Sequence, residues 1–315
     1  MARVSEIHRP HEKNQAASEA ITTEGHDFLY RTIGFAILCL LPAAFLLGSI
    51  RSLLIFILDN QTYTHIPLVP VVSLYLIYMG RKSIFAKTSY AWKIGSAVIV
   101  PGAACLALAR LNVWGLSLTN QNSLLMFGFV LLWAGAFGLF FGNHAFRAAS
   151  FPLLFLLFMV PVPQPLLPHV IFFLQEGSSK AAEWIYQLMG VPFLRQGFDF
   201  ALPGVTIRVA EECSGIRSAL GLLMLIVLAR HLFLRSSRNR ILLCLLAVAI
   251  AIVKNGFRIA SLSALAVYVN PAFLTGPLYH QGGALFFVFD LIVMAPLLIS
   301  LQKSENSGHA AGLVK

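Results

Sequence analysis

The sequence predicts an all-α polytopic membrane protein with about eight transmembrane helices, a small extracytoplasmic amphipathic helix and a β-hairpin. Three observations lead to this prediction. Of the 315 residues, 58% are hydrophobic and only 11% are charged, whereas soluble domains contain roughly 45–50% apolar and about 25% charged residues. The apolar residues form long runs, and the basic residues lie mostly at the ends of those runs. A lipid bilayer is therefore the expected solvent for most of the chain.

The first 31 residues are polar and are predicted to form a cytoplasmic tail. This tail is too long and too polar for the basic region of an ordinary signal peptide, and no small-residue cleavage site follows it. We therefore expect the first apolar segment to be retained as an anchor. The predicted division is an N-terminal tail (1–31), one transmembrane domain (32–301) and a cytoplasmic C-terminal tail (302–315).

Eight apolar segments are long enough, or nearly so, to cross a bilayer, which takes about 20 residues of helix. They lie at 32–50, 66–80, 94–111, 123–142, 148–163, 214–230, 241–260 and 281–301. The second segment is short. The fifth contains Pro152 and ends in a proline-rich run that stops a helix.

The net charge of +10 is explained by the distribution of Lys and Arg rather than by nucleic-acid binding. The basic residues flank apolar segments and form no single stripe of the kind that binds nucleic acid. With both termini in the cytoplasm, 15 Lys and Arg lie inside and five lie outside. Basic residues favour the cytoplasmic side of a membrane, so this orientation is predicted.

The longest outer segment in this orientation is 164–212. Its first part, 167–189, is amphipathic, with charged residues at helical spacing and aromatic residues suited to the membrane interface. In its second part Val205, Ile207 and Val209 alternate with polar residues after a Pro-Gly turn, which predicts a β-hairpin.

Cys213 is the residue that points most directly to chemistry. The other three cysteines lie inside apolar runs, where a small buried packing role is expected. Cys213 precedes the sixth apolar segment at the outer face, where a helix N-terminus stabilises a thiolate. Arg217, one helical turn later, adds positive charge on the same face. Glu211 and Glu212 act in the opposite direction, because nearby anions disfavour a thiolate.

Two further polar residues are expected at a similar depth. Arg258 lies near the outer end of the seventh segment with Asn255 one turn before it, and His280 opens the eighth segment. An arginine can stabilise an oxyanion, and an imidazole can transfer the proton that acyl transfer to a cysteine requires. Separately, Arg258 is also explained by snorkelling to lipid headgroups, His280 by an interfacial position, and Lys254 by a salt bridge within the bundle.

Other classes of site find less support. The sequence has no phosphate-binding loop, no His-Glu-x-x-His zinc motif and no Gly-x-Ser-x-Gly elbow. Ser214 with His280 suggests a membrane serine protease only weakly, because Cys213 stands beside the serine and is the better nucleophile. A transporter or polysaccharide-export protein that binds an anionic ligand is the main alternative. No metal or cofactor is expected.

The motifs that carry these residues resemble the exosortase/archaeosortase family of membrane cysteine transpeptidases. The resemblance rests on Cys-Ser-Gly-Ile-Arg-Ser at 213–218, on Asn255-x-x-Arg258 and on His280 before Gly-Gly. It extends to Tyr63-Thr64-His65, where Thr64 replaces a usual serine, and covers roughly 35–300. Tyr63 and His65 are therefore supporting site candidates, together with Arg217, Asn255 and Glu212.

The resemblance implies a bacterial enzyme with Cys213, Arg258 and His280 as catalytic residues. Archaeosortases typically carry arginine in place of His280, so the bacterial branch is favoured. The implied partners are the lipid bilayer and membrane-anchored proteins that end in a sorting signal, namely a short Pro-Glu-Pro-type motif, one transmembrane helix and a basic tail. The implied location is the bacterial inner membrane with the site toward the periplasm. The acceptor amine, and the choice between hydrolysis and transpeptidation, stay open.

Overall fold

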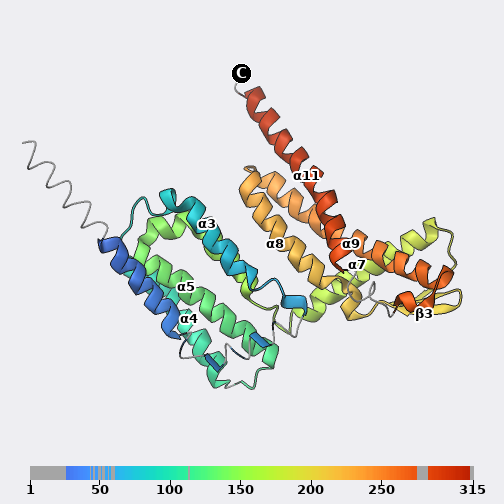
Figure 1. The fold of residues 1–315 in the computed structure, drawn as a ribbon, viewed down its shortest axis with the longest axis horizontal. Coiled ribbons are helices and arrows are strands. Elements are labelled where there is room, and N and C mark those ends of the chain that lie inside the picture. Colours follow the sequence, from blue (N-terminus) through green and yellow to red (C-terminus); the bar gives the residue numbers. More distant parts are fainter. Residues whose placement is uncertain are drawn as a thin grey trace, which may run out of the picture. The chain divides into compact units, whose positions relative to one another are not determined.

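The computed structural model describes a largely helical chain with one small sheet. The described residues are 26–42, 44, 47, 48, 51, 54, 55, 57, 61–112, 114–274 and 283–312. They form two compact units that meet in the chain between Pro163 and Gln164. Figure 1 shows the ribbon of each unit.

The first unit contains the helices from the first five predicted apolar segments. Residues 26–42 are helical. They are followed by η1 (Gln61–Tyr63), α3 (Leu68–Ile84), α4 (Trp92–Leu111), α5 (Leu118–Ala148), α6 (Ser150–Phe155) and η2 (Leu156–Met159). The fifth predicted segment is therefore a short α-helix followed by a 3₁₀ turn. The helix ends before the proline-rich run, because proline has no backbone N–H to donate within a helix.

Glycines allow α4 and α5 to pack closely along their lengths. A Cβ added at Gly95 of α4 would lie 2.5 Å from Leu139 Cβ, and one at Gly102 would lie 3.0 Å from Leu131 Cβ. On α5, a Cβ at Gly135 would lie 2.8 Å from the Ile99 backbone nitrogen. Small residues of this kind let helix backbones approach in a membrane, where no hydrophobic effect drives helices together.

Gly142 breaks the long helix α5 at the position where the fourth apolar segment was predicted to end. Its φ of 90° and ψ of 175° are not helical. A Cβ at this position would lie 2.5 Å from Ser89 Oγ, and the Ser89 N–H donates to the Phe141 carbonyl at 3.3 Å. Only glycine combines this backbone conformation with so close a neighbour.

The second unit is built around α9, the longest of the helices that the structure describes. Its elements are α7 (Leu167–Leu188), β1 (Leu194–Gln196), β2 (Asp199–Leu202), β3 (Val205–Arg208), η3 (Glu211–Ser214), α8 (Ile216–Phe233), α9 (Ser237–Tyr268), η4 (Pro271–Leu274) and α11 (Gly283–Gly312). Helices α7, α8 and α11 all contact α9, which therefore holds this unit together (Figure 1).

The far end of α11 is tied to the start of α9 by one side chain. The Glu305 carboxylate accepts hydrogen bonds from the backbone N–H groups of Arg235, at 2.8 Å, and Ser236, at 3.0 Å. It also accepts one from Asn239 Nδ2 at 3.0 Å. An acidic side chain at a helix N-terminus satisfies N–H groups that have no partner within the helix.

The predicted hairpin is a three-stranded antiparallel sheet in the order β1-β2-β3. Ala201 pairs with Thr206 on one side and with Leu194 on the other. The two turns contain Gly197 and Gly204, whose φ angles are 62° and 78°. The predicted Pro-Gly turn is thus confirmed, and an additional strand, β1, precedes it.

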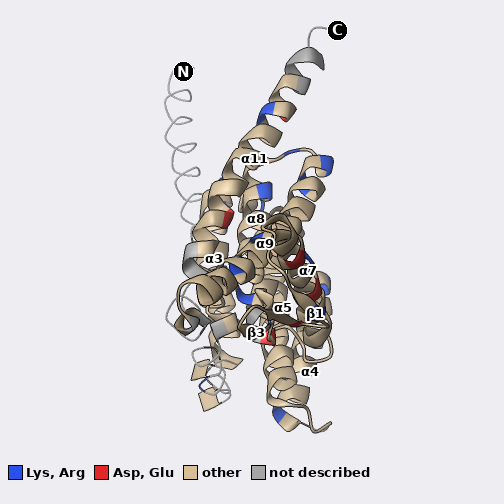
Figure 2. Cartoon of the chain, turned by 90° about the vertical axis from the view of Figure 1, so that its right-hand side faces the viewer, with Lys and Arg blue, Asp and Glu red and all other residues tan. Residues whose placement is uncertain are grey.

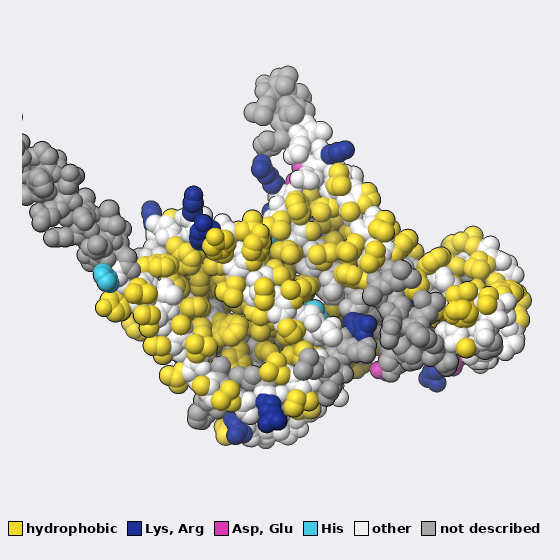
Figure 3. Space-filling model, in the orientation of Figure 1, with side chains coloured by type: hydrophobic (Ala, Val, Ile, Leu, Met, Phe, Trp, Pro, Cys, Tyr) yellow, Lys and Arg dark blue, Asp and Glu magenta, His cyan; other side chains and the backbone are white. Residues whose placement is uncertain are grey.

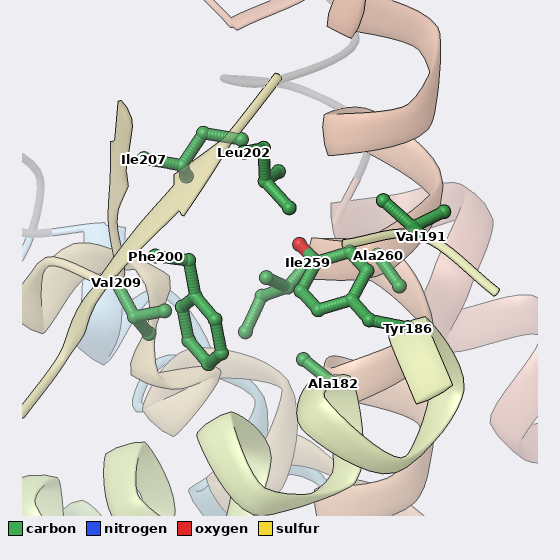
Figure 4. Close-up of a cluster of buried hydrophobic side chains, with 9 residues drawn as sticks. All are labelled: Ala182, Tyr186, Val191, Phe200, Leu202, Ile207, Val209, Ile259 and Ala260. Atoms are coloured by element: carbon green, nitrogen blue, oxygen red, sulfur yellow. The ribbon is translucent and has the colours of Figure 1, made fainter. Parts of the chain in front are cut away.

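The sheet is anchored to α7 and α9 by a buried apolar cluster. Figure 4 shows its nine side chains converging from the sheet and its flanks, from α7 and from α9. They are Ala182, Tyr186, Val191, Phe200, Leu202, Ile207, Val209, Ile259 and Ala260. The hydroxyl of Tyr186, which is 1% exposed, donates to Ser263 Oγ at 2.7 Å. This cluster fixes the strand that leads into Cys213.

Five helices in the described part of the chain are long and apolar enough to cross a membrane: α4, α5, α8, α9 and residues 286–307 of α11. Of the other three predicted spans, α3 has 17 residues and α6 with η2 forms a shorter apolar helix. The first predicted span is described only in part.

Long stretches of helix carry no charge (Figure 2), and hydrophobic side chains cover most of the face in Figure 3. The protein is a multi-pass membrane protein.

Candidate functional site

Cys213 lies in a tight connection between the sheet and α8. The strand β3 ends at Arg208, the 3₁₀ turn η3 carries Cys213, and α8 starts at Ile216. Gly215 joins the two helical segments with a φ of 79°, a left-handed conformation that strains any residue with a Cβ. The side chains of Glu212 and Cys213 lie outside the described part of the chain. The backbone nevertheless shows that Cys213 lies three residues before the first residue of α8.

The turn after Cys213 is held by two neighbouring hydroxyl groups. Ser214 is 1% exposed, and its Oγ accepts a hydrogen bond from the Ile216 N–H at 3.4 Å. Ser218 Oγ donates to the Gly215 carbonyl at 3.0 Å. The conformation around Gly215 is therefore fixed by side chains of the motif itself.

Asn255 of α9 supports the same turn from the side. It is 2% exposed, and its Nδ2 donates to Ser178 Oγ of α7 at 3.0 Å. Its Cγ would lie 2.9 Å from a Cβ added at Gly215, so the amide lies directly against this glycine. Asn255 thus connects α7, α9 and the turn that carries Cys213.

Helix α7 also holds the strand end before Cys213. Gln175 is buried, and its Nε2 donates to the Val209 carbonyl, four residues before Cys213. Next to Asn255, a Cβ at Gly256 would overlap the Cβ of Ala181, so α7 and α9 are in close contact here. The predicted amphipathic helix therefore supports the turn that carries Cys213.

A buried ion pair lies one turn from Arg258. Lys254 Nζ is 3.0 Å from Asp290 Oδ2, and the two side chains are 3% and 0% exposed. The same Nζ donates to Ser218 Oγ at 2.8 Å. The salt bridge that the sequence suggested for Lys254 is confirmed, and its partner lies on α11. This network joins α8, α9 and α11.

The remaining candidates are distributed over both units. Arg258 is half-buried on α9, a helix that contacts η3, and Arg217 is exposed in the first turn of α8. The structure therefore brings Asn255 to the Cys213 turn and puts Arg258 one turn further along the same helix. His280 lies outside the described residues.

Tyr63 and His65 belong to the first unit, near its proline-bounded end. Tyr63 is 2% exposed, and burial raises the pKa of its hydroxyl. Burial lowers the pKa of the His65 imidazole, while hydrogen bonds with the backbones of Phe158 and Thr62 act in the opposite direction. These two residues pack within their own unit, and their role in the site stays a prediction.

Metal ligands do not cluster in the described part of the chain, where no group of three His, Cys, Asp or Glu could hold an ion. Cys39, Cys105 and Cys244 are half-buried free thiols in helices. The donors that meet near the Cys213 turn are hydroxyl, amide and ammonium groups. Such groups can orient a backbone and stabilise negative charge.

Residues 57–296, which make up most of the chain, match a protein-family model described as the transmembrane exosortase. The chain belongs to the transmembrane exosortase family. No curated protein and no solved structure matches it. Membership confirms the resemblance seen in the motifs, and it makes the protein a membrane transpeptidase of the exosortase type. The matched range includes the Cys213 turn, Arg258 and the sequence position of His280.

Several residues around the Cys213 turn were not singled out from the sequence. Asp290 is a lone acidic residue within an apolar run, and an ionisable residue in a membrane helix is a functional candidate by default. That signal was available. Ser218 belongs to the motif at 213–218, although no role was assigned to it. Ser178 and Gln175 gave no signal, because isolated serines and glutamines are ordinary in such helices and only the contacts reveal their partners.

Proposed function

We propose that this exosortase cleaves the C-terminal sorting signals of exported membrane-anchored proteins through a thioester on Cys213. Arg258 stabilises the oxyanion, and His280 carries the proton. The observation that supports this most strongly is the family match, which spans all three residues in the order Cys, Arg, His. The reaction takes place at the periplasmic face of the bacterial inner membrane, and both termini are cytoplasmic.

The proposed reaction has two acyl-transfer steps. His280 takes the proton of the Cys213 thiol, the thiolate adds to a substrate peptide carbonyl, and the resulting oxyanion is stabilised by the Arg258 guanidinium. The carbon–nitrogen bond then breaks, and His280 gives its proton to the leaving amine, so that a thioester remains on Cys213. An incoming amine or water next loses a proton to His280 and attacks the thioester. The carbon–sulfur bond then breaks to give an amide or an acid, and His280 returns the proton to the Cys213 sulfur, which restores the thiol.

The position of Cys213 supports its role as nucleophile. It precedes the N-terminus of α8, where the helix dipole favours an anion. The neighbouring turn is supported by Asn255 and the Ser218 hydroxyl. A nucleophile reacts quickly when it is held in one geometry. Such support lowers the conformational entropy that must be lost to reach the transition state.

The alternative of an anion-binding transporter loses one of its two basic residues. Lys254 was a candidate ligand for an anion, but its charge is already matched by Asp290 at 3.0 Å. A buried, paired ammonium offers little net attraction to a second anion. Arg258 therefore keeps the oxyanion role that we propose for it.

The proposal is tested by trapping the acyl-enzyme. The full-length chain is co-expressed with a substrate that carries a Pro-Glu-Pro-type motif, a transmembrane helix and a basic tail. Mass analysis should find the N-terminal part of the substrate attached to Cys213 through a bond that hydroxylamine cleaves. Cys213→Ala should abolish processing while the protein still inserts. Arg258→Met should also abolish processing.

The matched control is Cys244→Ala, which removes a half-buried thiol from α9. We expect it to process the substrate as the parent does. Substrate cleavage that persists in a Cys213→Ala protein would rule the mechanism out. An adduct on a different cysteine would have the same meaning.

A further inference from the structure

The Lys254–Asp290 ion pair has no part in the proposed reaction, yet it is among the most deeply buried polar groups of the second unit. We propose that it is a positioning device for the exosortase site. Through the Ser218 hydroxyl it holds the turn that carries Cys213, and through Asp290 it fastens α11 to α9. The inference rests on the proposed function and adds two positioning residues to it.

The contacts form an unbroken path from α11 to the turn. Asp290 Oδ2 pairs with Lys254 Nζ at 3.0 Å, and the same Nζ donates to Ser218 Oγ at 2.8 Å. Ser218 Oγ in turn donates to the Gly215 carbonyl at 3.0 Å. Gly215 is two residues after Cys213. Three side chains from three helices therefore define the backbone next to the nucleophile.

The hydroxyl of Ser218 needs Lys254 in order to point one way. A serine hydroxyl has one proton and two lone pairs, and it rotates to suit its neighbours. When an ammonium occupies a lone pair, the proton is directed away from it, toward Gly215. The Gly215 carbonyl lies three residues before Ser218, and without the ammonium the hydroxyl can rotate away from it to another acceptor, such as the carbonyl four residues before Ser218. The turn then loses a defined partner.

The stability of the bundle does not by itself explain a buried ion pair. Both side chains are almost fully buried, and removing two charges from water costs free energy that their attraction often fails to recover. Apolar residues of similar volume commonly serve a fold as well or better. Asp290 Oδ1 is also buried and has no hydrogen-bond partner among the described residues, which adds to the cost. A pair retained at this cost fits a requirement for geometry.

The location of the pair fits the same requirement. Its three helices are α8, which follows Cys213, α9, which carries Arg258, and α11, which follows His280 in the chain. A single interaction at the point where these helices meet therefore restrains all of them relative to one another. A shift of about 1 Å in a catalytic group is enough to lower a rate roughly a hundredfold.

The test replaces the pair with apolar residues of similar size in the full-length protein, as Lys254→Met/Asp290→Leu. Cys39, Cys105 and Cys244 are first changed to Ala, so that only Cys213 reacts with a small water-soluble maleimide. We expect the double variant to insert and to unfold no more easily than its parent. We expect labelling of Cys213 to be at least about threefold faster, because a less restrained turn opens more often. With the tailed substrate, kcat should fall at least about tenfold while KM stays the same.

A second variant, Ser218→Ala, leaves the ion pair in place and removes only the hydroxyl that links it to Gly215. It should show the same faster labelling, and it remains informative if the double variant does not fold. The matched control is Lys180→Met on α7, whose lysine pairs with Glu176 at 3.2 Å but has a side chain that is 64% exposed. This control should label and process as the parent does.

The outcomes separate this inference from the proposed function. If the folded double variant and Ser218→Ala label and process like the parent, the pair is purely structural and the inference fails. If the parent itself does not process the substrate, the proposed function fails. In that case the labelling rates still decide whether the ion pair holds the turn.

Discussion

Gly215 and Gly204 have nearly the same backbone conformation, with φ angles of 79° and 78°, but different surroundings. A Cβ at Gly215 would lie 2.9 Å from Asn255 Cγ, whereas a Cβ at Gly204 would meet nothing within 4 Å. The two positions therefore separate backbone strain from crowding. At Gly215, the contact with Asn255 adds to the backbone strain.

We expect Gly215→Ala to destabilise the protein more than Gly204→Ala does. Both variants incur roughly 1–2 kcal/mol for a left-handed alanine. Gly215→Ala also pushes Asn255 away from Ser178, which adds about 1 kcal/mol or more. Thermal unfolding in detergent measures the difference, and processing should fall only in Gly215→Ala. Equal losses in the two variants would show that Asn255 does not support the turn.

His65 should make the first unit sensitive to mild acid. Burial lowers the pKa of its imidazole in the folded state below the ordinary value of 6.5. As the pH falls through about 6.5, the unfolded chain takes up a proton that the folded chain does not. The contribution of His65 to the free energy of unfolding is therefore fully present above the pKa of the unfolded chain. It decreases as the pH falls toward the pKa of the folded chain.

The measurement compares unfolding temperatures between pH 8 and pH 5 for the parent and for His65→Gln. We expect the parent to lose more stability than the variant over this interval. Parallel curves would mean that the histidine titrates alike in both states.

At the scale of secondary-structure elements, the helices pack differently within each of the two units. In the first unit, glycines bring α4 and α5 close along most of their length. In the second, α7 supports both the sheet and the turn that carries Cys213, through Gln175 and Ser178. Changes at these helix and sheet contacts should affect one unit at a time.

Gly95→Ala should destabilise the contact between α4 and α5. Its Cβ would lie 2.8 Å from the Leu139 Cα, so backbone has to move, at a cost of about 1–3 kcal/mol. Gly221→Ala in α8 is the matched control, because its nearest neighbour would be Phe287 at 3.6 Å, an ordinary contact. That variant should gain up to about 1 kcal/mol from helix propensity. Unfolding in detergent should therefore shift in opposite directions, and a shared direction would contradict the packing argument.

Arg195 of β1 should fasten the sheet to α7. It contacts Glu183 and Glu176 at 2.8 Å each, and its side chain is 16% exposed. Arg195→Met should remove about 1–2 kcal/mol of local stability, seen as faster amide exchange in β1 and β2. Arg208→Met is the control, since Arg208 is 77% exposed and 3.8 Å from Asp199, a pair worth little. Unchanged exchange in Arg195→Met would mean that the apolar cluster alone holds the sheet.

At the scale of the whole molecule, the distribution of charge predicts how the chain lies in the membrane. Fifteen Lys and Arg fall on the predicted cytoplasmic side and five on the other. The excess of basic residues inside is the strongest sequence signal for orientation. With both termini inside, the Cys213 turn, the sheet and α7 fall on the periplasmic side.

Cysteine labelling in intact cells tests this orientation. In a background that lacks the native cysteines, Lys180→Cys on α7 should react with a membrane-impermeant maleimide from outside. Lys87→Cys, between α3 and α4, should react only after the cells are opened. The reverse pattern would put the site in the cytoplasm, away from exported substrates.

Much of this protein follows from its sequence because the bilayer imposes strong local rules. A helix in lipid has to satisfy its own backbone, so apolar runs of sufficient length become helices wherever they occur. This rule gave α4 and α8 within three residues of their predicted bounds, whereas α5 and α9 extend past theirs at both ends and α11 ends eleven residues later than predicted. It worked less well at 148–163, where Pro152 and the following prolines shortened the helix, and at 194–196, where a three-residue strand carries too little periodicity to be seen.

The sequence by itself determined the membrane architecture, the family and the motif around Cys213, because each of these is written in local composition and spacing. The tertiary structure alone decided what supports the motif. Asn255 meets Ser178 across 77 residues, and Lys254 meets Ser218 across 36 residues and Asp290 on a third helix. No local pattern encodes such pairs, since they depend on which helix faces meet once glycines and serines have let the backbones approach.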